Sequence, residues 1–279
     1  MDDAKRSGNT ATSAPQMADN PMEKLLWVME RLRDPEHGCP WDVEQSFETI
    51  APYTIEEAYE VADAIRLKDM TALREELGDL LFQVVFHSRM AEEREEFDFL
   101  TVAKDLAEKM IRRHPHVFGD GQVASAAHQI RNWEDVKAAE RTAKQERSGD
   151  MSLLADVPLS LPALMRAEKL QKRAARVGFD WPQVRQVFDK IDEELAEIQE
   201  ELKGGASPER LNEEVGDLLF AVANLARHLG ADPEAALRDC NAKFEKRFRF
   251  IEDNFAGDLE NKSLDELEEA WQRAKSQDA

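Results

Sequence analysis

The chain has 279 residues, of which 42% are hydrophobic, and it carries a formal net charge of −21. This length and apolar content are sufficient for two globular domains and argue against a disordered chain. The acidic excess argues against general binding to nucleic acid or to anionic membranes, which would repel it, but not against a small anion held by a metal ion and local cations.

Residues 1–20 are mostly small and polar and contain no apolar stretch like that of a secretory signal, so they predict a disordered leader. The sequence also has no run of 18 apolar residues that could cross a membrane. The two cysteines, Cys39 and Cys240, are far apart and match no zinc-binding spacing. A reducing cytoplasm is therefore the predicted compartment.

Nearly every segment of the first half has helical periodicity, and no alternating strand pattern occurs. The first predicted helix begins at Asn20-Pro21 and ends before Asp34-Pro35. A second helix carries Glu57 and Glu60, a third runs from about Asp69, and a fourth starts after Thr101 and stops near Pro115. A loop containing Gly38-Cys39-Pro40-Trp41-Asp42 follows the first of them. These features predict an all-α fold.

Residues 119–158 carry the weakest signals, with a polar helix around Trp133 and a hinge at Ser148-Gly149-Asp150. The second half then resumes the helical pattern, with breaks at Gly178, Gly204-Gly205, Ser207-Pro208, Gly230 and Asp232-Pro233. The predicted organisation is a helical domain over 21–147, a linker over 148–158 and a second helical domain over 159–276.

The two halves share an ordered set of motifs, which indicates an internal duplication. The EExxE motif of residues 56–60 recurs at 193–197, and the block of residues 75–82 recurs at 213–220 with one substitution. The first pair is offset by 137 residues (56 to 193) and the second by 138 (75 to 213), so one residue was gained between them. Weaker repeats pair Trp41-Asp42 with Asp180-Trp181, Lys109 and Arg113 with Lys243 and Arg247, and Trp133 with Trp271.

Carboxylates spaced three apart lie on one face of a helix, as do Glu57 with Glu60 and Glu76 with Asp79. The second pair borders an apolar stripe, so two such helices packed antiparallel would bring four carboxylates into one groove. Like charges there repel strongly, and a hard divalent cation would offset the repulsion. An all-oxygen site without Cys or His suits Mg²⁺, with Mn²⁺ as a substitute.

A purely structural interpretation competes with this one, because Glu-rich helices are usually just solvated. Glu57 could also be the third residue of a capping box begun by Thr54, but Ile191 replaces that threonine in the second copy while the carboxylates persist. Gly78 and Gly216 recur inside helices, where glycine costs about 1 kcal/mol relative to alanine. Their recurrence predicts a close approach of helices.

The EExxE motif followed by ExxD resembles the signature of the MazG nucleotide pyrophosphohydrolases, relatives of the dimeric all-α dUTPases and the phosphoribosyl-ATP pyrophosphohydrolases. Residues 38–42, 113–118 and 132–134 are also similar to two-domain MazG proteins, and the resemblance covers about residues 21–276. It implies tandem duplicated MazG-type helical bundle domains. It also implies hydrolysis of a nucleoside triphosphate to a monophosphate and pyrophosphate.

The resemblance further implies roles for individual residues. The Mg²⁺ ligands correspond to Glu194, Glu197, Glu214 and Asp217, and their first-half counterparts are Glu57, Glu60, Glu76 and Asp79. The triphosphate contacts correspond to Lys190, Lys243 and Arg247, with Trp271 near the nucleotide. Glu193 is a candidate for holding the attacking water, although the metal or a second metal could do the same.

Several of these residues have an alternative interpretation. Lys243 and Arg247 lie four apart on one helical face, which suits a polyphosphate but also describes an exposed basic stripe. Trp271 could equally anchor a core. Tyr53 stands where the second half has Lys190, so the second site is the predicted main catalyst. The first site would then bind metal, act weakly or serve in assembly.

Other functional classes remain to be weighed. A di-iron carboxylate protein needs Glu-x-x-His motifs, and none of the six histidines has a Glu three residues before it. A non-enzymatic helical scaffold would tolerate loss of Glu197 or Glu214. A narrower dUTPase or dCTPase stays open, because the sequence does not fix the base preference. The resemblance implies nucleoside triphosphates and a second copy of the chain as partners. Residues 218–222 form a wide apolar face that would suit a dimer interface, although an ordinary core explains it too.

Overall fold

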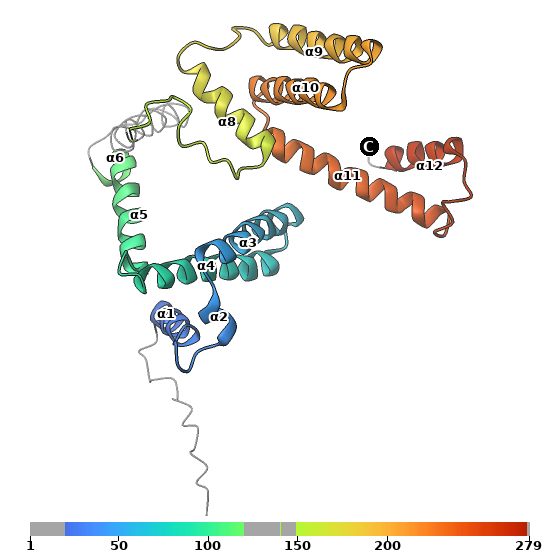
Figure 1. The fold of residues 1–279 in the computed structure, drawn as a ribbon. Coiled ribbons are helices and arrows are strands. Elements are labelled where there is room, and N and C mark those ends of the chain that lie inside the picture. The colour runs from blue at the N-terminus through green and yellow to red at the C-terminus, as the bar shows by residue number, and fades with distance from the viewer. Residues whose placement is uncertain (1–19, 120–139, 141–148, 278–279) are drawn as a thin grey trace, which may run out of the picture. The chain divides into compact units, whose positions relative to one another are not determined.

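The computed structural model of this chain describes residues 20–119, 140 and 149–277. All the regular secondary structure in this part is helical, which confirms the all-α prediction. The chain divides into two compact units, Met1–Val136 and Lys137–Ala279, which we call unit 1 and unit 2 (Figure 1). The predicted leader and the predicted helix around Trp133 lie outside the described residues, and the domain boundaries remain predictions.

The helices of unit 1 are α1 (Pro21–Leu32), α2 (Pro40–Glu44), α3 (Phe47–Leu67), α4 (Met70–Glu92), α5 (Phe99–Arg113) and α6 (Pro115–Phe118). The first begins as predicted, with the Asn20 side chain accepting a hydrogen bond from the Met22 amide. The α5 helix begins at Phe99 and not after Thr101, because Asp98 caps it by accepting from the Thr101 amide at 2.7 Å.

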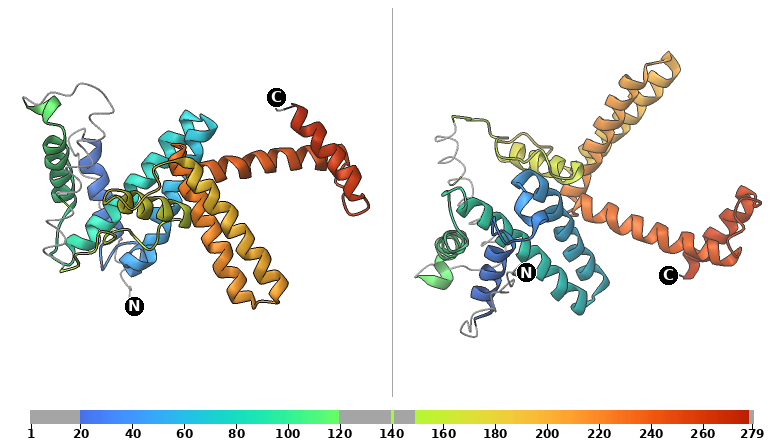
Figure 2. Two further views of the ribbon diagram at one scale, coloured as in Figure 1. Left: turned by 90° about the horizontal axis from the view of Figure 1, so that it is seen from above. Right: turned by 60° about the horizontal axis from the view of Figure 1, so that its bottom comes forward.

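The long helices α3 and α4 pack side by side as an antiparallel pair, which Figures 1 and 2 show from different directions. The α3 helix begins after Ser46, which forms a capping box with Thr49. Thr54 therefore lies well inside the helix, where its hydroxyl donates to the Ile50 carbonyl. The alternative in which Glu57 completes a capping box from Thr54 is wrong.

One end of this pair packs on α1 to form the core of unit 1. The buried core side chains are Met29, Ile50, Val85, Phe86 and Met90. Burial of such side chains is the main favourable contribution to folding, at about 25 cal/mol per Å² of apolar surface. The carboxylate-bearing ends of α3 and α4 extend beyond this core, so the site lies on the less buried part of the pair.

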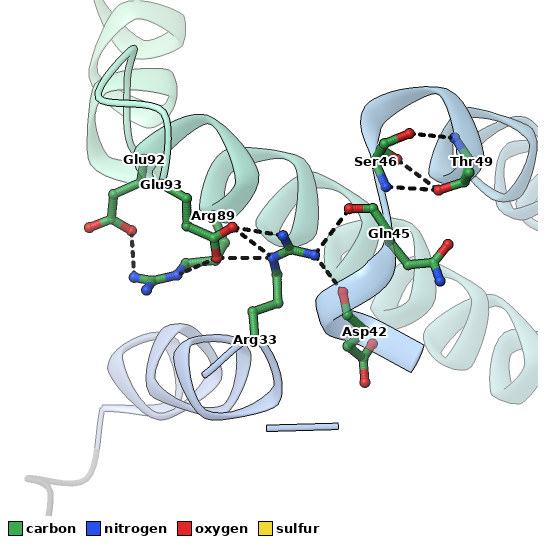
Figure 3. A network of polar contacts seen from close by, with 8 residues as sticks. All are labelled: Arg33, Asp42, Gln45, Ser46, Thr49, Arg89, Glu92 and Glu93. Atoms are coloured by element: carbon green, nitrogen blue, oxygen red, sulfur yellow. Dashed lines mark hydrogen bonds and ion pairs between the residues drawn. The ribbon is translucent and has the colours of Figure 1, made fainter. Parts of the chain in front are cut away.

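A buried arginine fixes the loop that contains Gly38 and the short helix α2 that follows it (Figure 3). The prediction of a loop is wrong for Pro40, Trp41 and Asp42, which lie in α2. Arg33 is 9% exposed, and its guanidinium donates to both carboxylate oxygens of Glu93 at 2.7–3.1 Å and to the backbone carbonyl of Asp42. A side chain at Gly38 would come within 2.5 Å of two backbone carbonyl oxygens, so only glycine fits there. The loop is therefore held rigidly between α1 and α4.

The helices of unit 2 are α8 (Ala163–Ala175), α9 (Val184–Gly204), α10 (Pro208–His228), α11 (Pro233–Asn254) and α12 (Leu264–Gln277). The α9 and α10 helices pair as α3 and α4 do, and α12 packs on α11 (Figures 1 and 2). The predicted helix starts at Ser207-Pro208 and Asp232-Pro233 are confirmed by side-chain caps from Ser207 and Asp232. No described helix is long and apolar enough to cross a membrane.

The turns between the paired helices contain the extra residue that the two offsets predicted. In unit 1 only residues 68 and 69 separate α3 from α4, and Lys68 has a positive φ of 58°. In unit 2 residues 205–207 separate α9 from α10, and Gly205 has the positive φ. Glycine adopts this conformation without the strain that a lysine side chain meets.

The predicted close approach at Gly78 and Gly216 is wrong within this chain. A side chain added at either glycine would meet no heavy atom within 4 Å. The reason is that both glycines lie on the outer face of their helix, next to Leu77 and Val215, which are 50% and 44% exposed. This face of α4 is therefore open.

Candidate metal centre

Three carboxylates of unit 2 converge in the groove between α9 and α10. Glu194, Glu214 and Asp217 each offer an oxygen within 4.8 Å of the other two. Glu194 is 4% exposed and Glu214 only 1%, and in each of them Oε2 has no hydrogen-bond partner among the described residues. At an effective dielectric constant of about 20, two charges at this distance repel by about 3 kcal/mol. Such a cluster needs positive charge nearby.

Two cations of unit 2 supply part of that charge. Lys190 donates to Glu194 at 2.8 Å and to Glu193 at 2.9 Å, and these hydrogen bonds raise the pKa of the lysine above its usual range. Arg210 forms an ion pair with Glu214 and also binds Glu201 at 3.0 Å. Both cations come from the same face of their helix as the carboxylate four residues later.

Glu197 lies beside this cluster, one turn after Glu193 and Glu194 on α9. Partial burial, followed by the charges of Glu194 and Glu214, raises the pKa of Glu197 above its ordinary value. Three of the four carboxylates predicted for unit 2 therefore converge, and Glu197 lies close enough for the charges of Glu194 and Glu214 to raise its pKa.

Unit 1 has the same carboxylates without the cations. Glu57, Glu76 and Asp79 converge within 4.8 Å, and burial followed by the charge of Glu60 raises the pKa of Glu76. Burial and then the charge of Asp79 raise the pKa of Glu57. The positions that correspond to Lys190 and Arg210 are occupied by Tyr53 (53 + 137 = 190) and Ala72 (72 + 138 = 210).

Removal of one of the carboxylate charges of the unit 1 cluster should stabilise unit 1 when no metal is bound. Glu57→Gln is expected to raise the melting temperature in EDTA at about pH 7, because the folded-state pKa of Glu57 is raised and the ionised form therefore destabilises the folded protein. The gain in melting temperature should vanish as the pH falls through the pKa of Glu57 in the folded protein and below its value of about 4.3 in the unfolded chain. At that pH the glutamate is neutral, as glutamine always is.

Thermal unfolding in EDTA at about pH 7 and about pH 4 measures this effect. Glu56→Gln is the matched control, because Glu56 is exposed on the same helix turn. A melting-temperature difference that does not change with pH would contradict the interpretation.

Two of the residues predicted to bind the nucleotide, Arg247 and Trp271, contact each other in unit 2. The Arg247 guanidinium stacks on the Trp271 ring at 5.6 Å, and Phe244 packs on the same ring at 5.3 Å. Lys243 is exposed on the same helix. The cations that pair with Glu194 and Glu214 are Lys190 and Arg210, which come from α9 and α10, whereas Arg247 stacks on Trp271.

The structure also adds a residue that sequence reasoning missed. Arg210 pairs with the most deeply buried carboxylate of the cluster, Glu214. The signal was available in the sequence, because Arg210 lies four residues before Glu214, just as Lys190 lies four before Glu194. The repeated motifs do not single out Arg210, because Ala72 occupies this place in the first copy.

Two parts of the chain match a known protein family. A family model described as the MazG nucleotide pyrophosphohydrolase domain matches residues 45–118 and 184–249. A nucleoside triphosphate pyrophosphohydrolase of Escherichia coli is 50% identical over 263 residues, which cover 93% of this chain and 98% of the relative. This chain belongs to the MazG family.

Two other relatives extend the comparison. A Thermotoga maritima protein described as a nucleoside triphosphate pyrophosphohydrolase/pyrophosphatase MazG is 45% identical, over 92% of this chain and 96% of its own length. A Bacillus subtilis protein, YabN, is 40% identical over 91% of this chain but only 53% of its own length.

Each of the two segments matched by the MazG model contains one complete carboxylate set. The prediction of tandem MazG domains is therefore confirmed. As a MazG protein the chain is an enzyme, a nucleotide pyrophosphohydrolase, and the alternative of a non-enzymatic scaffold is wrong. The matched segments include Lys243 and Arg247 but not Trp271.

Proposed function

We propose that this MazG protein hydrolyses nucleoside triphosphates to a monophosphate and pyrophosphate, and that unit 2 is its main catalyst. The observation that supports unit 2 is the convergence of Glu194, Glu214 and Asp217 beside two cations, Lys190 and Arg210. The triphosphate as substrate is supported by the names of the Escherichia coli and Thermotoga maritima relatives.

The proposed metal is Mg²⁺, with Mn²⁺ as a substitute, held by Glu194, Glu197, Glu214 and Asp217. The fit rests on two buried oxygens, Oε2 of Glu194 and Oε2 of Glu214, which have no partner in the described part of the chain. Hard oxygen ligands suit these ions, and a buried carboxylate oxygen without a partner is costly. When bound, the ion would neutralise charge on the phosphates and on the departing pyrophosphate.

The side chains around the metal ligands would then position the reactants. Lys190 is tied to Glu193 and Glu194, and a phosphate oxygen would compete with both for its three N–H donors. Loss of that ion pair would free the Glu193 carboxylate to accept a proton from the attacking water. The water oxygen would bond to the α-phosphorus as the bond from that phosphorus to the pyrophosphate oxygen breaks.

The proposed assembly is a homodimer. Leu219, Phe220 and Val222 on α10 are 51%, 45% and 42% exposed, which is a large apolar surface for one helix. A second copy covering this face is also a way to bring Lys243, Arg247 and Trp271 to a triphosphate. Unit 1, which lacks both cations, would bind metal, act weakly or serve in this assembly.

A panel of nucleoside triphosphates with Mg²⁺ or EDTA, with products separated by chromatography, tests the reaction. We expect monophosphate and pyrophosphate in Mg²⁺ and none in EDTA, and activity on one base alone would favour the narrower dUTPase or dCTPase. Diphosphate and inorganic phosphate would contradict the proposed bond cleavage. Sedimentation of the same preparation should give the mass of two 31.8 kDa chains, and the mass of one chain would contradict the dimer.

A further inference from the structure

Unit 2 contains a cavity that the proposed metal site does not use. It has a volume of about 490 Å³, within the range of pockets that bind small molecules, and lies between α8, α10 and the segment that precedes α9. Its apolar walls include Leu170, Trp181 and Phe220. Trp181 is 37% exposed, so a broad aromatic face borders the cavity and remains accessible.

Two buried amide side chains line the same cavity. Gln171 is 7% exposed; its Nε2 donates to the Phe220 carbonyl at 2.8 Å, while its Oε1 has no partner among the described residues. Asn224 is 4% exposed, and its hydrogen bonds within the described chain use only Oδ1, which accepts from Arg227. The Gln171 Oε1 acceptor is thus buried without a partner among the described residues, which costs about 1–3 kcal/mol. The amide nitrogen of Asn224 is a second polar group at the cavity.

Ion pairs hold the aromatic wall of the cavity in place. Asp180 binds Arg227 and accepts from His228 Nε2 at 3.0 Å, and it also accepts from the Trp181 amide. Arg227 itself is fixed by Asn224. The wall is therefore attached to the last turns of α10 and is not a free loop.

The cavity lies on the same face of α10 as the metal ligands. Glu214, Asp217, Ala221 and Asn224 follow one another at intervals of three and four residues, which places them in one row along the helix. Asp217 and Asn224 are seven residues apart, about 10 Å along the helix axis. This distance is of the size that separates the phosphates of a nucleotide from its base.

In unit 1 a large side chain stands at the position that corresponds to Asn224. Phe86 occupies the position of Asn224 (86 + 138 = 224), and its ring is 1% exposed within the core. Trp41, the counterpart of Trp181, packs edge-on against Tyr53 at 6.1 Å. The cavity therefore occurs together with Lys190 and Arg210, in the unit that has the more complete site.

We propose that this cavity binds the base of the substrate nucleotide. Trp181 stacks on the base, Gln171 Oε1 accepts a hydrogen bond from a base N–H, and the Asn224 amide donates to a base acceptor. The inference rests on the proposed function, because it takes the triphosphate of the same nucleotide to lie at Glu214 and Asp217. Gln171 and Asn224 are then the residues that discriminate among bases.

Equilibrium binding of two probes in the presence of Mg²⁺ tests the proposal: a non-hydrolysable α,β-methylene nucleoside triphosphate and inorganic tripolyphosphate. Trp181→Ala should weaken binding of the nucleotide analogue about tenfold or more, as expected for loss of base stacking, and leave tripolyphosphate binding unchanged. Trp41→Ala is the matched control in unit 1 and should change neither. Equal weakening of both probes by Trp181→Ala, or no weakening, would overturn the proposal.

Two further variants guard against misfolding. Asn224→Phe introduces the residue that unit 1 has at this position and should fill the cavity, and Gln171→Leu removes the acceptor with little change of volume. Both variants should weaken binding of the nucleotide analogue only. Circular dichroism is the control for folding. Glu214→Gln should weaken both probes. If wild-type protein binds the analogue at this cavity but releases no pyrophosphate from a triphosphate, the proposed function fails and the base site stands. If it binds no analogue, the base site fails.

Discussion

Glu214→Gln is expected to lower the kcat for nucleoside triphosphate hydrolysis about 10²–10³-fold, the range found when one electrostatic partner of a reacting group is removed. Glu214 is the most buried carboxylate of the unit 2 cluster, and its neutral amide would bind a divalent cation poorly. Steady-state kinetics in saturating Mg²⁺ measures the loss. The fold should survive, because the substitution removes one of three converging negative charges.

Glu76→Gln is the matched control, since Glu76 holds the same position in unit 1. We expect it to leave most of the rate intact, with the melting temperature of both variants recorded in EDTA and in Mg²⁺. If Glu76→Gln abolishes turnover and Glu214→Gln does not, unit 1 is the catalytic unit and the proposal that unit 2 is the main catalyst is wrong.

The double substitution Lys190→Tyr with Arg210→Ala gives unit 2 the residues of unit 1. Two charged hydrogen-bond donors would be lost, each worth about 1.5–3 kcal/mol, so kcat/KM should fall about 10²–10⁴-fold. Affinity for Mg²⁺ alone should not fall, and we expect it to rise, because Lys190 and Arg210 no longer compete with the ion for Glu194 and Glu214. Kinetics and titration calorimetry measure the two opposite effects.

A structural role for these cations would give a different result. If Lys190 and Arg210 served only to stabilise the helices, the double variant would lose melting temperature equally in EDTA and in Mg²⁺, and its kcat/KM would follow the folded fraction. The complementary pair Tyr53→Lys with Ala72→Arg should lower Mg²⁺ affinity at the unit 1 carboxylates. No change there would argue against competition between cation and metal.

The features that the sequence predicted well are those that depend on local rules. Asn20-Pro21, Ser207-Pro208 and Asp232-Pro233 start helices because a capping side chain and a proline act within one turn. The pairing of EExxE with ExxD across two helices followed from helical spacing and from the order of the repeated motifs. Each of these rests on contacts that neighbouring residues in the sequence make.

The features that failed or stay predictions depend on what a helix face meets in space. Gly78 and Gly216 recur in sequence, but only the packed structure shows that their face is open. The placement of Lys243, Arg247 and Trp271 at the triphosphate stays a prediction, because helical spacing does not give the direction of α11, which tertiary packing sets. The cavity beside Trp181 depends on Asn224 and Gln171, which come from different helices and form no sequence motif.

The turns described above also bear on how the chain tolerates change. The two carboxylate sets converge alike although one turn is a residue longer than the other. The alignment of the paired helices is therefore maintained by side chains packed along their length, and the connecting segment merely has to span the gap. Insertions at 68–69 or 205–207 would lengthen an outer bend while the converging carboxylates, two helical turns away, keep their register.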